Sequence, residues 1–217
     1  MKTISFLSVA MLAMCFSGRA QKLLTEGSIR YSVSIGPVAG GTTFTEHAGT
    51  YTITIKGRLL RKELSMNTGY HAVIITNGNT GAAYSLQASG GQNYAIQLRH
   101  EDIAEKQKPY EGFAIGEAQG SSTIAGWPCQ KASVRYKDGS TSVLYYTSAW
   151  NTEDSTVFDR FPGLKGIPLS FEYRNEEGIT MHFSAEALET SPVESALFRV
   201  PPDYRIISNA EYRKGRE

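Results

Sequence analysis

Cysteine is scarce in this chain, which contains only Cys15 and Cys129. Cys15 falls in an N-terminal segment that we expect to be removed, so the mature protein keeps one cysteine and cannot form an internal disulfide. The fold must then be stabilised by its core alone, and we expect Cys129 to be a small buried apolar residue. None of the four histidines lies at metal-ligand spacing from another, so we expect no metal site and no cofactor.

Catalytic motifs are also missing. The chain has no HExxH metal helix, no GxSxG nucleophile elbow and no GxxxxGKS/T phosphate loop. Adjacent carboxylates occur at Glu101-Asp102 and Glu153-Asp154, but a glycosidase needs two carboxylates that face each other across a cleft. We therefore expect a non-enzymatic protein without catalytic residues and keep a hydrolase as the least favoured alternative.

Neither sign of charge dominates, since the chain has 22 basic and 21 acidic residues. Residues 1–20 contain Lys2 and Arg19 but no acid, which leaves 20 basic residues against 21 acidic ones in the remainder. A protein that binds the phosphate backbone usually carries a clear basic excess. The charge balance therefore predicts that nucleic acid is not a partner.

Long apolar runs are confined to the N-terminus. Lys2 precedes an apolar run over residues 4–16, and small residues follow at Gly18 and Ala20. This layout is typical of a secretory signal peptide, and the run is too short for a membrane-spanning helix. We predict that residues 1–20 are a signal peptide cleaved near Ala20–Gln21. The mature protein would then be periplasmic or secreted, without a transmembrane segment.

An alternative interpretation makes Cys15 the modified cysteine of a lipoprotein. Leu12-Ala13-Met14-Cys15 partly matches the motif that precedes such a cysteine. Met14 argues against it, because the residue before the modified cysteine is normally small. The alternative would anchor the protein to a membrane and stays open here.

Alternation of apolar and polar residues with a period of two is the strongest pattern in the chain. It occurs at residues 29–35, 51–55, 94–98 and 167–173. The dipeptides Asn77-Gly78 and Asp138-Gly139 predict tight hairpin turns between such segments. Only residues 100–110, and a short stretch near 191–197, suggest helix.

The pattern predicts a mainly β protein built from one large, curled antiparallel sheet with one or two short helices as a lid. We expect residues 21–26 to lead into a single domain over residues 27–204. Residues 205–217 form a charged C-terminal tail, of which we expect residues 211–217 to be loose.

The segment DRFPGLKGIPLSFEY, residues 159–173, combines glycine and proline with a clean alternating run. Pro168 cannot donate to a sheet ladder, so we expect it at a strand start, an edge or a bulge. No potential catalytic partner accompanies the segment. It is therefore interpreted as a structural element that leads into a strand.

Three segments carry a resemblance to a known family: Ile124-Ala125-Gly126 through Cys129-Gln130-Lys131-Ala132 and Asp138-Gly139 to Tyr145-Tyr146-Thr147, then Gly166-Ile167-Pro168-Leu169-Ser170-Phe171-Glu172-Tyr173, and Leu197-Phe198-Arg199-Val200-Pro201-Pro202-Asp203-Tyr204. Together they look like an uncharacterised exported family of Bacteroidetes-type bacteria, which is in turn similar to LolA-like periplasmic lipoprotein carriers. The resemblance covers roughly Gly27 to Tyr204. It implies an incomplete antiparallel half-barrel whose apolar concave face holds acyl chains beneath a short-helix lid, and it implies no catalytic residue.

A broad sheet with few helices has an apolar face that must close on itself, meet a partner or hold an apolar ligand. Our first hypothesis is an exported envelope protein that binds a lipid or the acyl chains of a lipoprotein on this face. The candidate lining residues are the apolar residues of the predicted central strands: Ile53, Ile55, Tyr84, Leu86, Tyr94, Ile96, Leu98, Leu169 and Phe171. The alternative hypothesis is an envelope protein-interaction module with a filled core and no ligand cavity.

Overall fold

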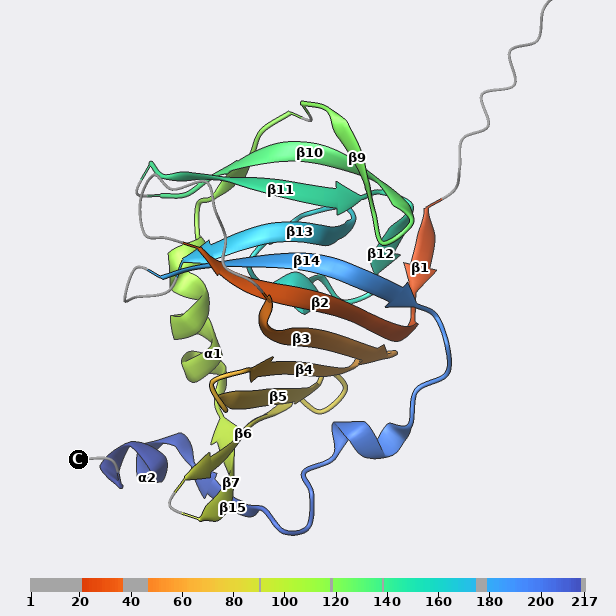
Figure 1. The fold of residues 1–217 in the computed structure, drawn as a ribbon. Helices are drawn as coiled ribbons and strands as arrows, with labels where there is room; N and C mark the ends of the chain where they lie inside the picture. The colour runs from red at the N-terminus through yellow and green to blue at the C-terminus, as the bar shows by residue number, and fades with distance from the viewer. Residues whose placement is uncertain are drawn as a thin grey trace, which may run out of the picture.

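Figure 1 shows the fold in a computed structural model, which describes residues 21–36, 47–89, 91–117, 119–137, 139–174 and 179–215. The predicted signal peptide, including Cys15, lies outside these ranges. Two sheets are present among the described residues. The larger has 13 strands, and the smaller pairs β1 (Lys22–Leu24) with β12 (Trp150–Thr152) in parallel.

The strands of the large sheet come from almost the whole described length of the chain. Their bounds are β2 (Glu26–Gly36), β3 (His47–Lys56), β4 (Leu59–Met66), β5 (His71–Asn77), β6 (Ala82–Ser89), β7 (Gln92–Leu98), β8 (Ala114–Ile115), β9 (Ser121–Ile124), β10 (Trp127–Arg135), β11 (Thr141–Thr147), β13 (Ile167–Arg174), β14 (Thr180–Glu189) and β15 (Arg205–Ser208).

The large sheet has the strand order β15-β7-β6-β5-β4-β3-β2-β14-β13-β11-β10-β8, and β9 also pairs with β10. Each pairing is antiparallel except that of β15 with β7, which is parallel. The sheet curls but does not close, so the predicted mainly β fold with one large curled sheet and few helices is confirmed. Its pairing is mixed instead of purely antiparallel, because the C-terminal chain returns to add β15 at one edge.

Alternation defines the two faces of the sheet. In β2, Ile29, Tyr31 and Val33 are fully buried, whereas the residues between them point to the other side. Because residues opposite each other in paired strands share a face, this buried face also carries Ile53 of β3 and Phe171 of β13. We call it the inner face, and the opposite side is the outer face.

Both faces are covered where β5, β6 and β7 lie. On the outer face, Phe198 of the 3-10 helix η3 (Ser195–Phe198) packs against Val73, Ile75 and Leu86. On the inner face, Ile103 and Tyr212 pack against Ala83, Ile96 and Leu98. These two covering residues come from α1 (His100–Gln107) and α2 (Asn209–Lys214). The helices therefore cover one end of the inner face, not its centre (Figure 1).

The hairpin predicted at Asn77-Gly78 forms, but its turn is longer than the expected two residues. The loop spans residues 78–81, and Gly81, with φ of 74°, is the glycine in the left-handed region. The Asn77 side chain fixes this geometry, because its Oδ1 accepts hydrogen bonds from the backbone N–H groups of Asn79 (3.0 Å) and Thr80 (3.3 Å). The second hairpin joins β10 to β11 as predicted, although Asp138 itself lies outside the described residues.

The C-terminal segment forms β15 and α2, and α2 continues to Lys214, into the stretch from residue 211 that was expected to be loose. Ser208 and Glu211 make a capping box at the start of α2. Asn209 Nδ2 donates to Asp102 Oδ1 at 2.7 Å, which ties α2 to α1. Local capping and this tertiary contact supply the order that the charged composition did not predict.

Candidate functional site

The centre of the inner face is filled by a connection that the sequence left irregular. Residues 153–166, which we call the plug segment, join β12 to β13 and include the 3-10 helix η2 (Ser155–Phe158). Val157, Phe158 and Phe161 of this segment are buried in the same core cluster as Ile53 and Phe171. Phe161 packs edge-on against Phe171, with 5.3 Å between ring centroids. The plug segment thus occupies the place where an acyl chain would lie.

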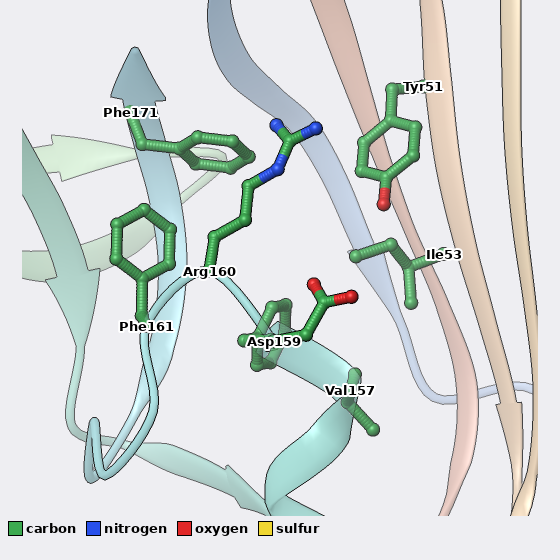
Figure 2. A pocket seen from close by; sticks show the side chains of 8 residues that line it. Tyr51, Ile53, Val157, Asp159, Arg160, Phe161 and Phe171 are labelled. Carbon is green, nitrogen blue, oxygen red and sulfur yellow. The ribbon is translucent and has the colours of Figure 1, made fainter. Parts of the chain in front are cut away.

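Between the plug segment and the sheet remains a recess of about 20 Å³. Its lining, drawn in Figure 2, is formed by Tyr51, Ile53, Val157, Phe158, Asp159, Arg160, Phe161 and Phe171. A single buried water needs roughly 10–15 Å³, whereas small-molecule pockets measure roughly 300–1,000 Å³. The recess can accommodate a water molecule or the tip of a side chain, but not a lipid chain.

A second hollow, of about 300 Å³, also borders the plug segment. All its lining residues come from one continuous stretch, residues 151–165, so β12 and the plug segment that follows it form the hollow. Glu153 and Lys165 in its lining are exposed. The hollow is therefore a local feature of this stretch and does not extend over the strands of the inner face.

A buried ion pair connects the plug segment to the sheet. Lys62 of β4 places its Nζ 3.0 Å from Asp159 Oδ1, and the Lys62 side chain is only 11% exposed. Burial lowers the pKa of Lys62, and the neighbouring Asp159 carboxylate opposes that shift. A charge at this depth needs its counter-ion, so Asp159 helps to fix the plug segment in place.

Arg160, next in the chain, stacks on aromatic rings, and among the described residues no carboxylate pairs with it. Its guanidinium lies 3.8 Å from the ring centroid of Tyr173 and 5.7 Å from that of Phe183. Such stacking over an aromatic face is favourable for arginine. Figure 2 shows the guanidinium directed between Phe171 and Tyr51, toward the recess.

Two tyrosines lie near Arg160 and Asp159, and one of them, Tyr51, lines the recess. Burial raises the pKa of Tyr51 well above its ordinary value, and the nearby Arg160 charge opposes that shift only in part. Burial also raises the pKa of Tyr110, in the 3-10 helix η1 (Lys108–Tyr110), to about 12. Both phenols are neutral at physiological pH and can donate hydrogen bonds.

The nine predicted lining residues do not form one surface. Ile53, Ile55, Leu169 and Phe171 belong to the main core cluster, and of these only Ile53 and Phe171 line the recess. Tyr94, Ile96 and Leu98 lie on the inner face as well, but at the end that α1 and α2 cover. Tyr84 and Leu86 lie on the outer face, in the cluster around Phe198.

Sequence patterns did not indicate that Asp159 and Arg160 would line this recess, or that Lys62 would pair with Asp159. One signal was available, because Lys62 stands between Leu60 and Leu64 on the apolar side of a predicted strand. A charge in such a position requires a buried partner or a function. Nothing local indicated that the partner would be Asp159, far away in the sequence.

Other chemistry-bearing side chains have structural surroundings. Cys129 is buried, and its Sγ contacts the Trp127 carbonyl at 3.4 Å, as expected for a small apolar residue. Burial lowers the pKa of His182, whose Nε2 lies 3.4 Å from Ser170 Oγ. Over the described ranges, no group of three or more His, Cys, Asp or Glu side chains is placed to hold a metal ion. Within those ranges, none of the helices is both long and apolar enough to span a membrane.

Comparison with known proteins gives a fold class but no family. No protein-family model matches the chain, and no curated protein sequence matches it. Among solved structures, an uncharacterised conserved protein from Thermus thermophilus has a TM-score of 0.50 at 12% identity, over 86% of this chain and 93% of that one. At that identity the likeness shows a shared fold.

Weaker matches include MucB and a lipoprotein-sorting domain. MucB in the Pseudomonas aeruginosa MucA/MucB complex has a TM-score of 0.41 and 13% identity, over 85% of this chain and 59% of that one. A putative outer membrane lipoprotein-sorting protein domain from Vibrio parahaemolyticus has a TM-score of 0.21 and 10% identity, over 80% of this chain and 89% of that one. A lipoprotein-sorting domain is thus among the structural neighbours, whereas no match supports the Bacteroidetes-type family.

Proposed function

We propose that this chain is an exported, non-enzymatic protein of the cell envelope that acts as a protein-interaction module with a filled core. The observation that supports this proposal is the plug segment, which packs Val157, Phe158 and Phe161 onto the centre of the inner face. With about 20 Å³ left beside it, the folded protein offers no volume for an acyl chain there. The filled-core hypothesis accounts for this geometry better than the lipid-binding one.

A lipid could enter the inner face only if the plug segment moved away. Exposing three apolar side chains of this size would cost on the order of 5–9 kcal/mol, at about 1.5–3 kcal/mol each. The Lys62–Asp159 ion pair would be broken as well. A penalty of this size is comparable with the whole stability of a typical domain. Lipid carriage would therefore need a different state of the protein.

Site-specific photo-crosslinking in the native host tests the interaction with a protein partner. A photoreactive phenylalanine analogue would replace, one at a time, the exposed residues Leu23, Tyr70 and Ile206, which lie in different parts of the fold. We expect one position to give a discrete adduct with a single protein. Phe198, buried on the outer face, serves as the control and should give none. Absence of protein adducts at every exposed position would contradict the proposal, and lipid adducts at Phe161 would favour lipid binding instead.

The export part of the proposal is tested by the mass of the purified mature protein. Cleavage near Ala20–Gln21 predicts a chain that begins at Gln21. A diacylated N-terminal Cys15 would instead establish the lipoprotein alternative. A full-length chain that retains Met1 would contradict export through this segment.

A further inference from the structure

Arg160 has an unusual environment for a half-buried cation. Its guanidinium stacks on Tyr173 and approaches Phe183, but within the described ranges no ion pair or hydrogen bond to a side chain or carbonyl accompanies that stacking. A guanidinium has five N–H donors, and donors removed from water are costly when they have no acceptor. The neighbouring Lys62, by contrast, has Asp159.

The carboxylates next to the plug segment act on Lys62. Asp159 pairs with Lys62 at 3.0 Å, and Lys62 also feels the charge of Asp154, whereas Arg160 has no carboxylate paired with it among the described residues. One further carboxylate would complement this guanidinium. A doubly charged phosphate would be repelled more strongly by the adjacent Asp159 carboxylate.

The hydrogen-bond donors of Arg160 and Tyr51 also suit a planar acceptor such as a carboxylate. Figure 2 shows the guanidinium directed between Phe171 and Tyr51, and the Tyr51 ring borders the same recess. The planar fork of arginine binds a carboxylate through two parallel N–H···O bonds. The neutral Tyr51 hydroxyl can add a third donor. Asp159 is 40% exposed, so this side of the recess opens to solvent and can be reached from outside.

We propose that Arg160 and Tyr51 form a binding site for one carboxylate, presented by an acidic side chain of a protein partner. The protein nature of the partner rests on the proposed function. The carboxylate chemistry rests on the recess itself. The plug segment would then have two roles, since Asp159 fixes it to the sheet while Arg160 faces the partner.

An NMR titration of the isolated mature protein tests the site without any partner. The probe is N-acetylglutamic acid α-amide, which has one carboxylate, and its matched control is N-acetylglutamine α-amide, the uncharged isostere. We expect the acid to shift the Arg160 Nε–Hε signal in a saturable way and the amide to leave it unchanged. An equal response to the amide, or affinity for inorganic phosphate as high as for the acid, would overturn the carboxylate assignment.

Variants separate this site from a general charge effect. We expect R160Q to abolish the saturable response and R160K to weaken affinity about tenfold, because an ammonium lacks the planar fork. Y51F should weaken affinity about threefold, as expected for loss of one hydrogen bond. K165Q removes an exposed charge from the same segment and should change affinity less than about twofold. Binding that survives in R160K and R160Q alike, with both folded by their NMR spectra, would refute the site.

The two proposals fail in different ways. If the titration fails while crosslinking yields a protein adduct, the partner binds elsewhere and the carboxylate site is refuted. If the titration succeeds while crosslinking yields no protein, the site stands and the protein-interaction proposal is refuted. Competition by the glutamate probe against the crosslinked adduct would support both.

Discussion

At the scale of single residues, the start of β13 shows how an irregularity in strand pairing is compensated. The β11–β13 ladder shifts register between Tyr145 and Tyr146, as expected near a proline that lacks an N–H donor. The β13–β14 ladder begins only at Ser170. Tyr31, fully buried on β2, donates from its hydroxyl to the Pro168 carbonyl at 2.8 Å. One side chain thus provides a hydrogen bond next to the irregularity.

Replacing Tyr31 by phenylalanine should reduce the free energy of unfolding by about 1–2 kcal/mol, because a buried carbonyl loses its donor. Urea unfolding of the mature protein measures this. The matched control is Tyr146→Phe, which removes a hydroxyl bonded to Gln130 in an exposed setting and should cost less than about 0.5 kcal/mol. Equal losses in the two variants would contradict the role assigned to Tyr31.

The Lys62–Asp159 pair should respond asymmetrically to mutation. Lys62→Met removes a buried charge and leaves Asp159, which is 40% exposed, free to be hydrated, so we expect a change within about 1 kcal/mol. Asp159→Asn leaves the Lys62 ammonium buried without its counter-ion and should destabilise by about 2–3 kcal/mol. The double variant should be close to Lys62→Met alone. Urea unfolding of all three decides, and a symmetric result would contradict a buried Lys62 charge.

At the scale of elements, the junction of α1 and α2 depends on one carboxylate. Asp102 Oδ2 accepts a hydrogen bond from the Arg99 backbone N–H at 2.9 Å, which caps α1, and Oδ1 accepts from Asn209 of α2. These hydrogen bonds, first that from the Arg99 backbone, lower the pKa of Asp102 below its ordinary value of 3.8. Ionised Asp102 therefore stabilises both helices on the inner face of β6 and β7.

The sign of this pKa shift sets a pH dependence. A carboxyl whose pKa is lowered by folding contributes stability that is fully present above its unfolded pKa and is lost as pH falls through the folded one. We expect the protein to be more stable than Asp102→Asn by about 1 kcal/mol near pH 6, with the difference vanishing well below pH 3.8. Thermal unfolding of both proteins from pH 6 to pH 2 measures it. A difference that stayed constant with pH would contradict the assignment.

At the scale of the whole molecule, alternation predicted the large sheet because a strand buried on one side records that burial in its sequence. β2 is the clear example, because Ile29, Tyr31 and Val33 are fully buried on the inner face while the residues between them are at least partly exposed. Alternation failed to assign faces in β6, since Ala83 and Leu86 are both buried although they point to opposite sides. A strand covered on both faces carries no such record.

The recess could be predicted from the sequence even less than the large sheet could. Its polar residues come together only because the plug segment crosses the inner face. Val157 and Phe161 show no periodicity that would predict this crossing. The pairing of Lys62 with Asp159 is a property of the tertiary fold. Sequence patterns report which residues are buried more readily than which of them meet.

A filled inner face leaves no room for a lipid, and native mass spectrometry of the mature protein purified from its native host measures whether one is bound. We expect a single species at the mass of the polypeptide, unchanged after incubation with excess fatty acid. A lipid adduct of one-to-one stoichiometry, present on isolation or gained on incubation, would contradict this expectation.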